Sequence, residues 1–101
     1  MSKTNLHLLP GELAQVRRIL RAFVPEQRVF IFGSRATGNQ LKPHSDLDVL
    51  IQVEIPLPLR QKRQLTEAFD ESSLPFKVDV LESTELDSSF LQAVTQEALP
   101  I

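Results

Sequence analysis

The chain has 101 residues, 42% of them hydrophobic and 24% charged, with a formal net charge of −2 and no cysteine. This length and composition predict one globular domain over residues 1–101, and they exclude disulfides, thiolate metal sites and a global basic field for strong nucleic-acid binding by the chain alone. No apolar run is long enough to span a membrane and no apolar leader follows a basic start, so we expect a cytoplasmic protein.

The first predicted element is a helix that begins at Pro10 and ends before Pro25. Proline is tolerated in the first turn of a helix, and it disfavours helical backbone in the residue before it. Between the two prolines, apolar side chains recur every three or four residues and form one stripe, which consists of Leu13, Val16, Leu20 and Phe23.

A short strand is predicted next, at residues 28–32, because the run RVFIF is β-branched and aromatic. Gly33 ends this strand. Residues 34–38 then form a turn or the start of a short helix, which Gly38 and Asn39 close. A glycine at the end of a strand also lets a ligand approach the backbone closely.

The next predicted strand spans residues 46–53 and opens with two aspartates at alternate positions. Aspartate is uncommon inside strands, and alternate residues share a face, so Asp46 and Asp48 point to the same side. The opposite face of this strand is apolar and consists of Leu47, Val49, Ile51 and Val53.

Two further helices are predicted in the second half of the chain. One spans residues 60–70, with Leu65 and Phe69 one turn apart. The last begins near Asp87 or Ser88 as its N-cap. Its apolar stripe consists of Phe90, Leu91, Val94 and Ala98.

The last predicted strand spans residues 76–82, between these two helices. It places Asp79 on one face together with Lys77 and Leu81. The element order predicts an α+β two-layer fold, in which a small mixed sheet carries helices on one face. The uncovered face of the sheet then carries Asp46, Asp48 and Asp79.

These three aspartates are the main functional candidates. Asp46 and Asp48 project to the same side of their strand, about 6.5–7 Å apart along the chain, and Asp79 joins them if its strand is the neighbour. Converging carboxylates repel one another and therefore need raised pKa values or bound divalent cations. Mg²⁺ prefers oxygen ligands, and two such ions can hold the attacking and leaving oxygens of a phosphoryl displacement.

The turn FGSRATG, residues 32–38, supplies a candidate anion site. The backbone at Gly33, the hydroxyl of Ser34 and the guanidinium of Arg35 are groups that bind phosphate. Only one loop separates them from the first two aspartates, and a metal–nucleoside triphosphate needs an anion site and a cation site together. On the residues alone, a plain strand-ending turn with Arg35 in a structural ion pair stays open as an alternative.

In combination, these motifs resemble the nucleotidyltransferase superfamily typified by DNA polymerase beta. The pattern is Gly33-Ser34, eleven intervening residues, Asp46-x-Asp48 and a later strand aspartate, Asp79. The runs GSRATG, SDLDVLI and VDVL are most similar to its minimal nucleotidyltransferase (MNT) branch, and the resemblance covers about residues 12–98.

The resemblance implies a role for each of these residues. Gly33 and Ser34 would hold the β- and γ-phosphates of a nucleoside triphosphate. Asp46 and Asp48 would ligate two Mg²⁺ ions, and Asp79 would complete the ligands of the ion that activates the attacking hydroxyl. The implied reaction is transfer of a nucleoside monophosphate, with AMP from ATP as our expectation, and release of pyrophosphate.

The resemblance also implies a partner. MNT proteins commonly pair with a small helical protein, either a HEPN-type ribonuclease toxin that the MNT antitoxin adenylylates or a helical-bundle subunit that binds substrate. We therefore expect an antitoxin enzyme. The alternative is a non-catalytic subunit that neutralises or presents a helical partner by contact alone. Transfer to a small molecule such as an aminoglycoside is a weaker reading, because little chain is left for a second substrate pocket.

Structural readings of single residues remain beside these functional ones. Asp46 can cap the turn that follows Ser45, and Asp79 can form an ion pair with Lys77 on the same face. His44 is interpreted as a solvated loop residue and not as a general base. The basic run at residues 60–64 is interpreted as a solvated helix face, with contact to an acidic or nucleic-acid partner as the alternative.

Overall fold

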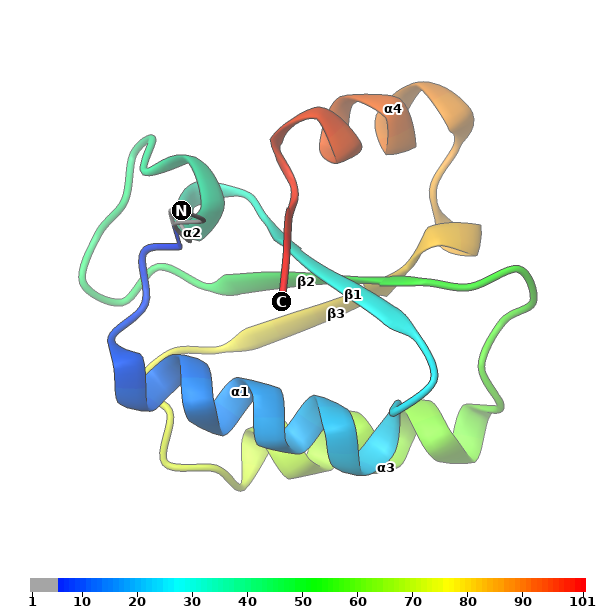
Figure 1. Cartoon of the computed structure of the whole chain (residues 1–101), viewed down its shortest axis with the longest axis horizontal. Coiled ribbons are helices and arrows are strands. Elements are labelled where there is room, and N and C mark those ends of the chain that lie inside the picture. The colour runs from blue at the N-terminus through cyan, green and yellow to red at the C-terminus, as the bar shows by residue number, and fades with distance from the viewer. Residues whose placement is uncertain (1–5) are drawn as a thin grey trace.

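A four-stranded mixed sheet lies at the centre of the computed structural model, which describes residues 6–101 (Figure 1). The strand order is β3-β2-β1-β4. β1 (Arg28–Phe32) and β2 (Leu47–Gln52) are antiparallel neighbours, β3 (Val78–Glu82) runs parallel to β2, and the short β4 (Leu99–Pro100) pairs antiparallel with β1. The predicted α+β class with a small mixed sheet is confirmed.

The helices lie where the apolar periodicity predicted them. The first begins at Pro10, and the N-cap of the last is Asp87, whose side chain accepts a hydrogen bond from the N–H of Phe90 at 2.8 Å. The helical segments are α1 (Pro10–Phe23), α2 (Ser34–Thr37), α3 (Leu59–Asp70), the 3-10 turn η1 (Ser83–Glu85) and α4 (Ser88–Glu97).

The main core lies between the sheet and the pair α1 and α3, which share one face of it (Figure 1). The predicted stripe of α1 is buried at Val16 and Leu20, and that of α3 at Leu65 and Phe69. Each such side chain contributes about 1.5–3 kcal/mol when it leaves water. The sheet side of this core includes Ile31, Leu47, Val49 and Ile51, all fully buried.

Helix α4 departs from the predicted single helical layer, because it packs against the opposite face of the sheet (Figure 1). Its Leu91 and Val94 form a second, smaller cluster there with strand residues that include Phe32 and Leu50. The physical reason is that the face with the aspartates is apolar over much of its length. That apolar part needs cover, whereas the end that carries Asp48 does not.

The strand bounds differ from the prediction by one or two residues at the functional end. Asp46 immediately precedes β2, and Phe76 lies two residues before β3. The edge strand β4 was not predicted, because two residues that include a proline carry no strand periodicity. Residues 1–5, over which the predicted domain also extends, lie outside the described residues. In the described part, no helix combines the length and apolar character needed to cross a membrane.

Candidate active site

Asp48 and Asp79 are direct neighbours across the parallel pair β2 and β3. The register places Asp48 opposite Asp79 and Leu47 opposite Val78. The N–H of Leu47 also donates a hydrogen bond to the carbonyl oxygen of Lys77 at 2.9 Å, which fixes this register at the start of both strands. Adjacent strands lie about 4.8 Å apart. The condition for Asp79 to lie beside Asp48, that β2 and β3 are neighbours, is therefore met.

The negative charges around Asp48 alter its ionisation. Burial is the largest cause and the charges of Asp79, Asp46 and Glu97 follow, and together they raise the pKa of Asp48 to about 6 from 3.8. Neighbouring carboxylates raise a carboxyl pKa because they disfavour its charged form. Four acidic side chains from three different segments thus lie near enough to one another, at the end of the sheet, for their charges to interact.

The donor chemistry at this place fits a hard divalent cation, but the ligands are not gathered around a single point. Within residues 6–101, no three Asp, Glu or His side chains lie close enough together to hold one metal ion. Asp79 Oδ1 instead lies 3.5 Å from Lys77 Nζ, with the two side chains 40% and 70% exposed. Ion pairs this exposed are weak. Lys77 can therefore leave Asp79 by side-chain motion alone.

Gly33 brings the predicted phosphate turn into contact with Asp48. The residue has φ +76°, and a methyl group in place of its hydrogen would lie 2.3 Å from Asp48 Oδ2. Left-handed backbone and lack of space both demand glycine here. Ser34 follows at once as the first residue of α2. The turn and the carboxylates therefore form one continuous site.

Glu97 is a member of this site that the sequence analysis missed. The N–H of Gly33 donates a hydrogen bond to Glu97 Oε2 at 2.8 Å. Glu97 is the last residue of α4, so its position depends on the face of the sheet that α4 covers. No local sequence signal reports that face.

Arg35, which was predicted to bind phosphate, lies in a buried position with structural contacts. The residue is 6% exposed, and its guanidinium donates to the carbonyl oxygens of Ser45 (2.9 Å), His7 (2.9 Å) and Pro43 (3.3 Å). It also lies over the ring of Phe76, 4.1 Å from the centroid. A guanidinium has five donors, and here the loop before β2 and the N-terminal segment supply the acceptors. Within residues 6–101, Arg35 forms no ion pair with a loop acid, which was the alternative.

The remaining singled-out residues lie outside this constellation. His44 is exposed in the loop before β2. In the basic run at residues 60–64, Gln61 donates to the carbonyl oxygen of Phe23 at 2.8 Å and Lys62 lies 3.3 Å from the buried carboxylate of Glu82. Part of that run therefore ties α3 to its neighbours.

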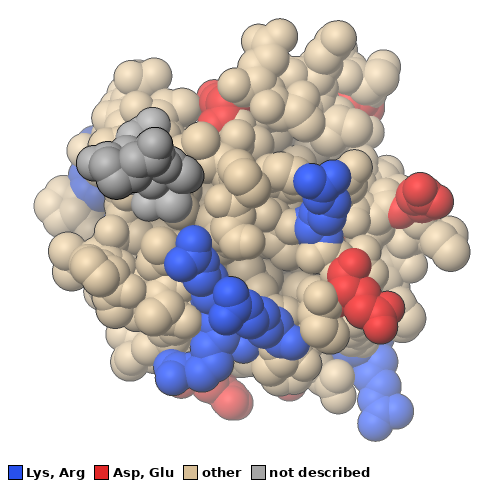
Figure 2. Space-filling model, viewed as in Figure 1, with Lys and Arg blue, Asp and Glu red and all other residues tan. Residues whose placement is uncertain are grey.

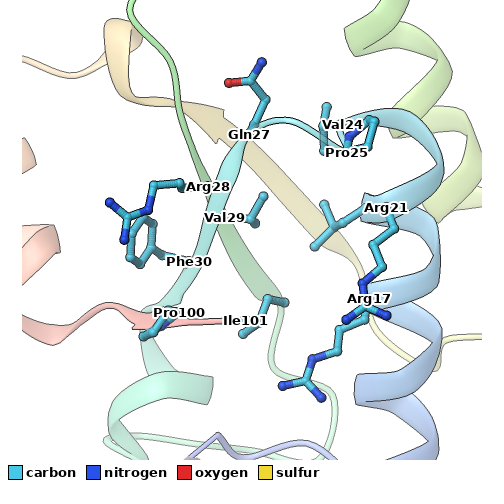
Figure 3. Close-up of a pocket in the computed structure, with 11 residues that line it drawn as sticks. Arg17, Arg21, Val24, Pro25, Gln27, Arg28, Val29, Phe30, Pro100 and Ile101 are labelled. Carbon is cyan, nitrogen blue, oxygen red and sulfur yellow. The ribbon is translucent and has the colours of Figure 1, made fainter.

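A pocket of about 260 Å³ lies at the opposite end of β1 from Gly33 (Figure 3). Arg17 and Arg21 of α1 and Arg28 of β1 line it, and none of the predicted site residues does. Figure 2 shows Lys and Arg side chains gathered over α1 on the face in view. The molecule thus separates a basic region from the acidic site.

Comparison with known proteins identifies the family. The family described as "Nucleotidyltransferase domain" matches residues 13–101. A curated relative, "Probable protein adenylyltransferase MntA" of Haemophilus influenzae, is 40% identical over 93 residues, which cover 92% of this chain and 81% of the relative. The chain therefore belongs to the nucleotidyltransferase domain family and is a nucleotidyltransferase. The resemblance inferred from the glycine-serine and aspartate motifs is confirmed.

Solved structures agree with this fold. One named as a candidate minimal nucleotidyltransferase has a TM-score of 0.70 and 28% identity, over 88% of this chain and 91% of that chain. A toxin–antitoxin crystal structure with AMP-PNP has a TM-score of 0.68 and 22% identity, over 86% of this chain and 69% of that one. At the latter identity the likeness concerns the fold alone.

Proposed function

We propose that the protein is a Mg²⁺-dependent adenylyltransferase, which transfers AMP from ATP to a hydroxyl group of a partner protein and so acts as an antitoxin. The observation that carries the proposal is the contact between Gly33 and the Asp48 carboxylate, with Asp79 in register beside it. The 40% identical relative named as a probable protein adenylyltransferase supports the choice of AMP and of a protein acceptor.

In this proposal each group at the end of the sheet has one task. Gly33 and Ser34 hold the β- and γ-phosphates, and Asp46, Asp48 and Asp79 hold the metal, two ions by the family resemblance. Bound Mg²⁺ neutralises phosphate charge and lowers the pKa of the attacking hydroxyl. The acceptor oxygen forms a bond to the α-phosphorus, the bond to pyrophosphate breaks, and the hydroxyl proton passes to water.

The proposed partner is a small helical protein of the HEPN toxin type. The resemblance to MNT proteins and the 40% identical relative named MntA support a partner protein. A non-catalytic subunit that acts by contact alone is the second candidate, favoured by the separation of the acidic side chains within residues 6–101. The intact mass of the partner purified with this protein separates the two. An increase by one or more AMP groups supports the enzyme, and an unmodified partner in a tight complex supports the binding subunit.

The substitutions Asp48→Asn and Asp79→Asn test the catalytic assignment. We expect each to lower AMP transfer by about 100-fold or more, since each removes a charge needed for the phosphoryl-transfer site. Thermal stability should be unchanged or higher, because mutual carboxylate repulsion is relieved. The assay follows radiolabelled AMP on the partner with ATP and Mg²⁺. Asp70→Asn, at the exposed end of α3, is the matched control. Full transfer activity in both variants would refute the assignment.

A further inference from the structure

The carboxylate of Glu97 accepts the hydrogen bond of the Gly33 N–H, the backbone donor that a triphosphate would need. Gly33 N–H is directed at Glu97 Oε2 at 2.8 Å, and the proposed function assigns the same N–H to a phosphate oxygen. One N–H in this geometry serves one anion at a time. A carboxylate therefore stands in the structure where a phosphate oxygen would bind.

The backbone on both sides of Glu97 is held in place. Val94, one turn earlier, is 4% exposed in the small core under α4, and Leu99, two residues later, pairs with Ile31 of β1. The Glu97 side chain itself is exposed. It can therefore leave Gly33 by rotation about its own bonds, while α4 and β4 stay where they are.

The surroundings of this contact provide space for a larger anion. A pocket of about 200 Å³ lies between α4 and the turn, and its lining includes Gly33, Phe32, Phe90 and Glu97. Asp48 borders the same turn. An anion that enters without a cation meets two carboxylates, whereas a metal-bound triphosphate brings its own counter-charge.

We propose that Glu97 is an affinity-setting residue of this nucleotidyltransferase, whose carboxylate closes the triphosphate site until a metal-bound triphosphate displaces it from Gly33. The inference rests on the proposed role of Gly33. It adds that Glu97 competes with substrate, so that anions that arrive without a metal ion do not open the site. Removal of the carboxylate then tightens binding of nucleotide instead of weakening it.

The first test measures the affinity of Mg²⁺–α,β-methylene-ATP, which cannot lose pyrophosphate, by isothermal titration calorimetry. We expect Glu97→Ala to bind it about three- to tenfold more tightly than the wild type, the value of one charged hydrogen bond after solvent screening. Glu97→Gln keeps an acceptor but loses the charge, and should fall between the two. Gln96→Ala, exposed on the same helix, and Glu54→Gln, an exposed carboxylate beyond the other end of β2, are controls that should bind like the wild type.

The second test observes the backbone amide of Gly33 by NMR. Its resonance should shift in metal- and nucleotide-free Glu97→Ala, and saturating nucleotide should bring the wild-type and variant resonances to the same position. An unchanged or weaker affinity in Glu97→Ala, even with lower thermal stability, would show a structural or ligating role and overturn the proposal. A Gly33 resonance that saturating nucleotide leaves unmoved would overturn it as well.

The two proposals fail in different ways. If the wild type binds the analogue and transfers AMP while Glu97→Ala binds it equally, only the inference on Glu97 is lost. If neither protein binds the analogue and Asp48→Asn leaves transfer unchanged, the proposed function is lost and the inference falls with it.

Discussion

Asp48 lies against Gly33 and near three other carboxylates, and these surroundings change the pKa of its side chain. Burial and those charges raise its pKa to about 6 from 3.8. A carboxyl with a raised folded-state pKa stabilises the fold fully below its unfolded pKa, and that contribution is lost as the pH rises through the folded value. The metal-free protein therefore carries unfavourable charge at neutral pH.

The prediction at this scale concerns the pH dependence of folding without metal. Between about pH 4 and pH 7 the wild type should lose about 1–2 kcal/mol of unfolding free energy relative to Asp48→Asn, a value reduced for solvent screening of a half-exposed group. Urea unfolding in EDTA at several pH values measures the difference. Parallel profiles for the two proteins would contradict the raised pKa.

Single residues also mark the limit of prediction from sequence. The alternation in residues 46–53 was enough to place Asp46 and Asp48 on one face, because strand periodicity is local. The burial of Arg35 was not predictable, since its acceptors in the loop and its contact with Phe76 exist only after folding. The sequence alone does not distinguish an arginine that faces a phosphate from one that faces the interior, because the local motif is the same in both cases.

At the scale of elements, α2 and the loop that follows it depend on Arg35. Its guanidinium joins the segment at His7, the loop at Pro43 and Ser45, and the segment before β3 through Phe76. The N–H of His7 returns a hydrogen bond to the carbonyl oxygen of Arg35 at 2.7 Å. This side chain thus links the short helix to three other segments, while Ala36 packs in the main core.

We expect Arg35→Lys to destabilise the protein by about 2–4 kcal/mol, because an ammonium cannot serve three carbonyls and lie flat on a ring at once. Chemical denaturation measures the loss, and Arg63→Lys on the exposed side of α3 is the control that should be neutral. If Arg35→Lys instead folds normally and loses only nucleotide affinity, the phosphate role must be restored.

The elements themselves were largely predictable, but their arrangement was only partly so. Periodicity placed α1, α3 and the three longer strands to within two residues, because each carries a regular apolar pattern. The stripe of α4 predicts that the helix is buried and does not say against which face. Glu97 escaped notice for the same reason, since its contact with Gly33 joins residues that are 64 positions apart in the chain.

For the whole molecule, two cores of unequal size lie on the two faces of the sheet. The cluster under α1 and α3 contains most of the fully buried side chains, whereas the cluster under α4 has three buried residues, namely Phe32, Leu50 and Val94. Removal of a side chain costs less unfolding free energy where that side chain is only partly buried. The face of the sheet that carries the aspartates therefore has the smaller core, and the opposite face has the larger one.

The same substitution on each face tests this asymmetry. Leu65→Ala, in the main core at 0% exposure, should cost about 3–5 kcal/mol, and Leu91→Ala, half-buried on α4, about 1–2 kcal/mol. Urea unfolding gives both values, and hydrogen exchange should show the amides of α4 opening before those of α1 and α3. Equal losses in the two variants would show that the cores are equivalent.

Arg17, Arg21 and Arg28 lie near the start of β1, whereas Asp48 and Asp79 lie beside its other end. Nucleotide without a bound metal ion is a polyanion, so it is attracted to the arginine end and repelled from the end with the aspartates. The magnesium complex of the same nucleotide has less negative charge and is repelled less. If the proposed function holds, occupancy of the acidic end should therefore follow the concentration of free magnesium as well as that of ATP.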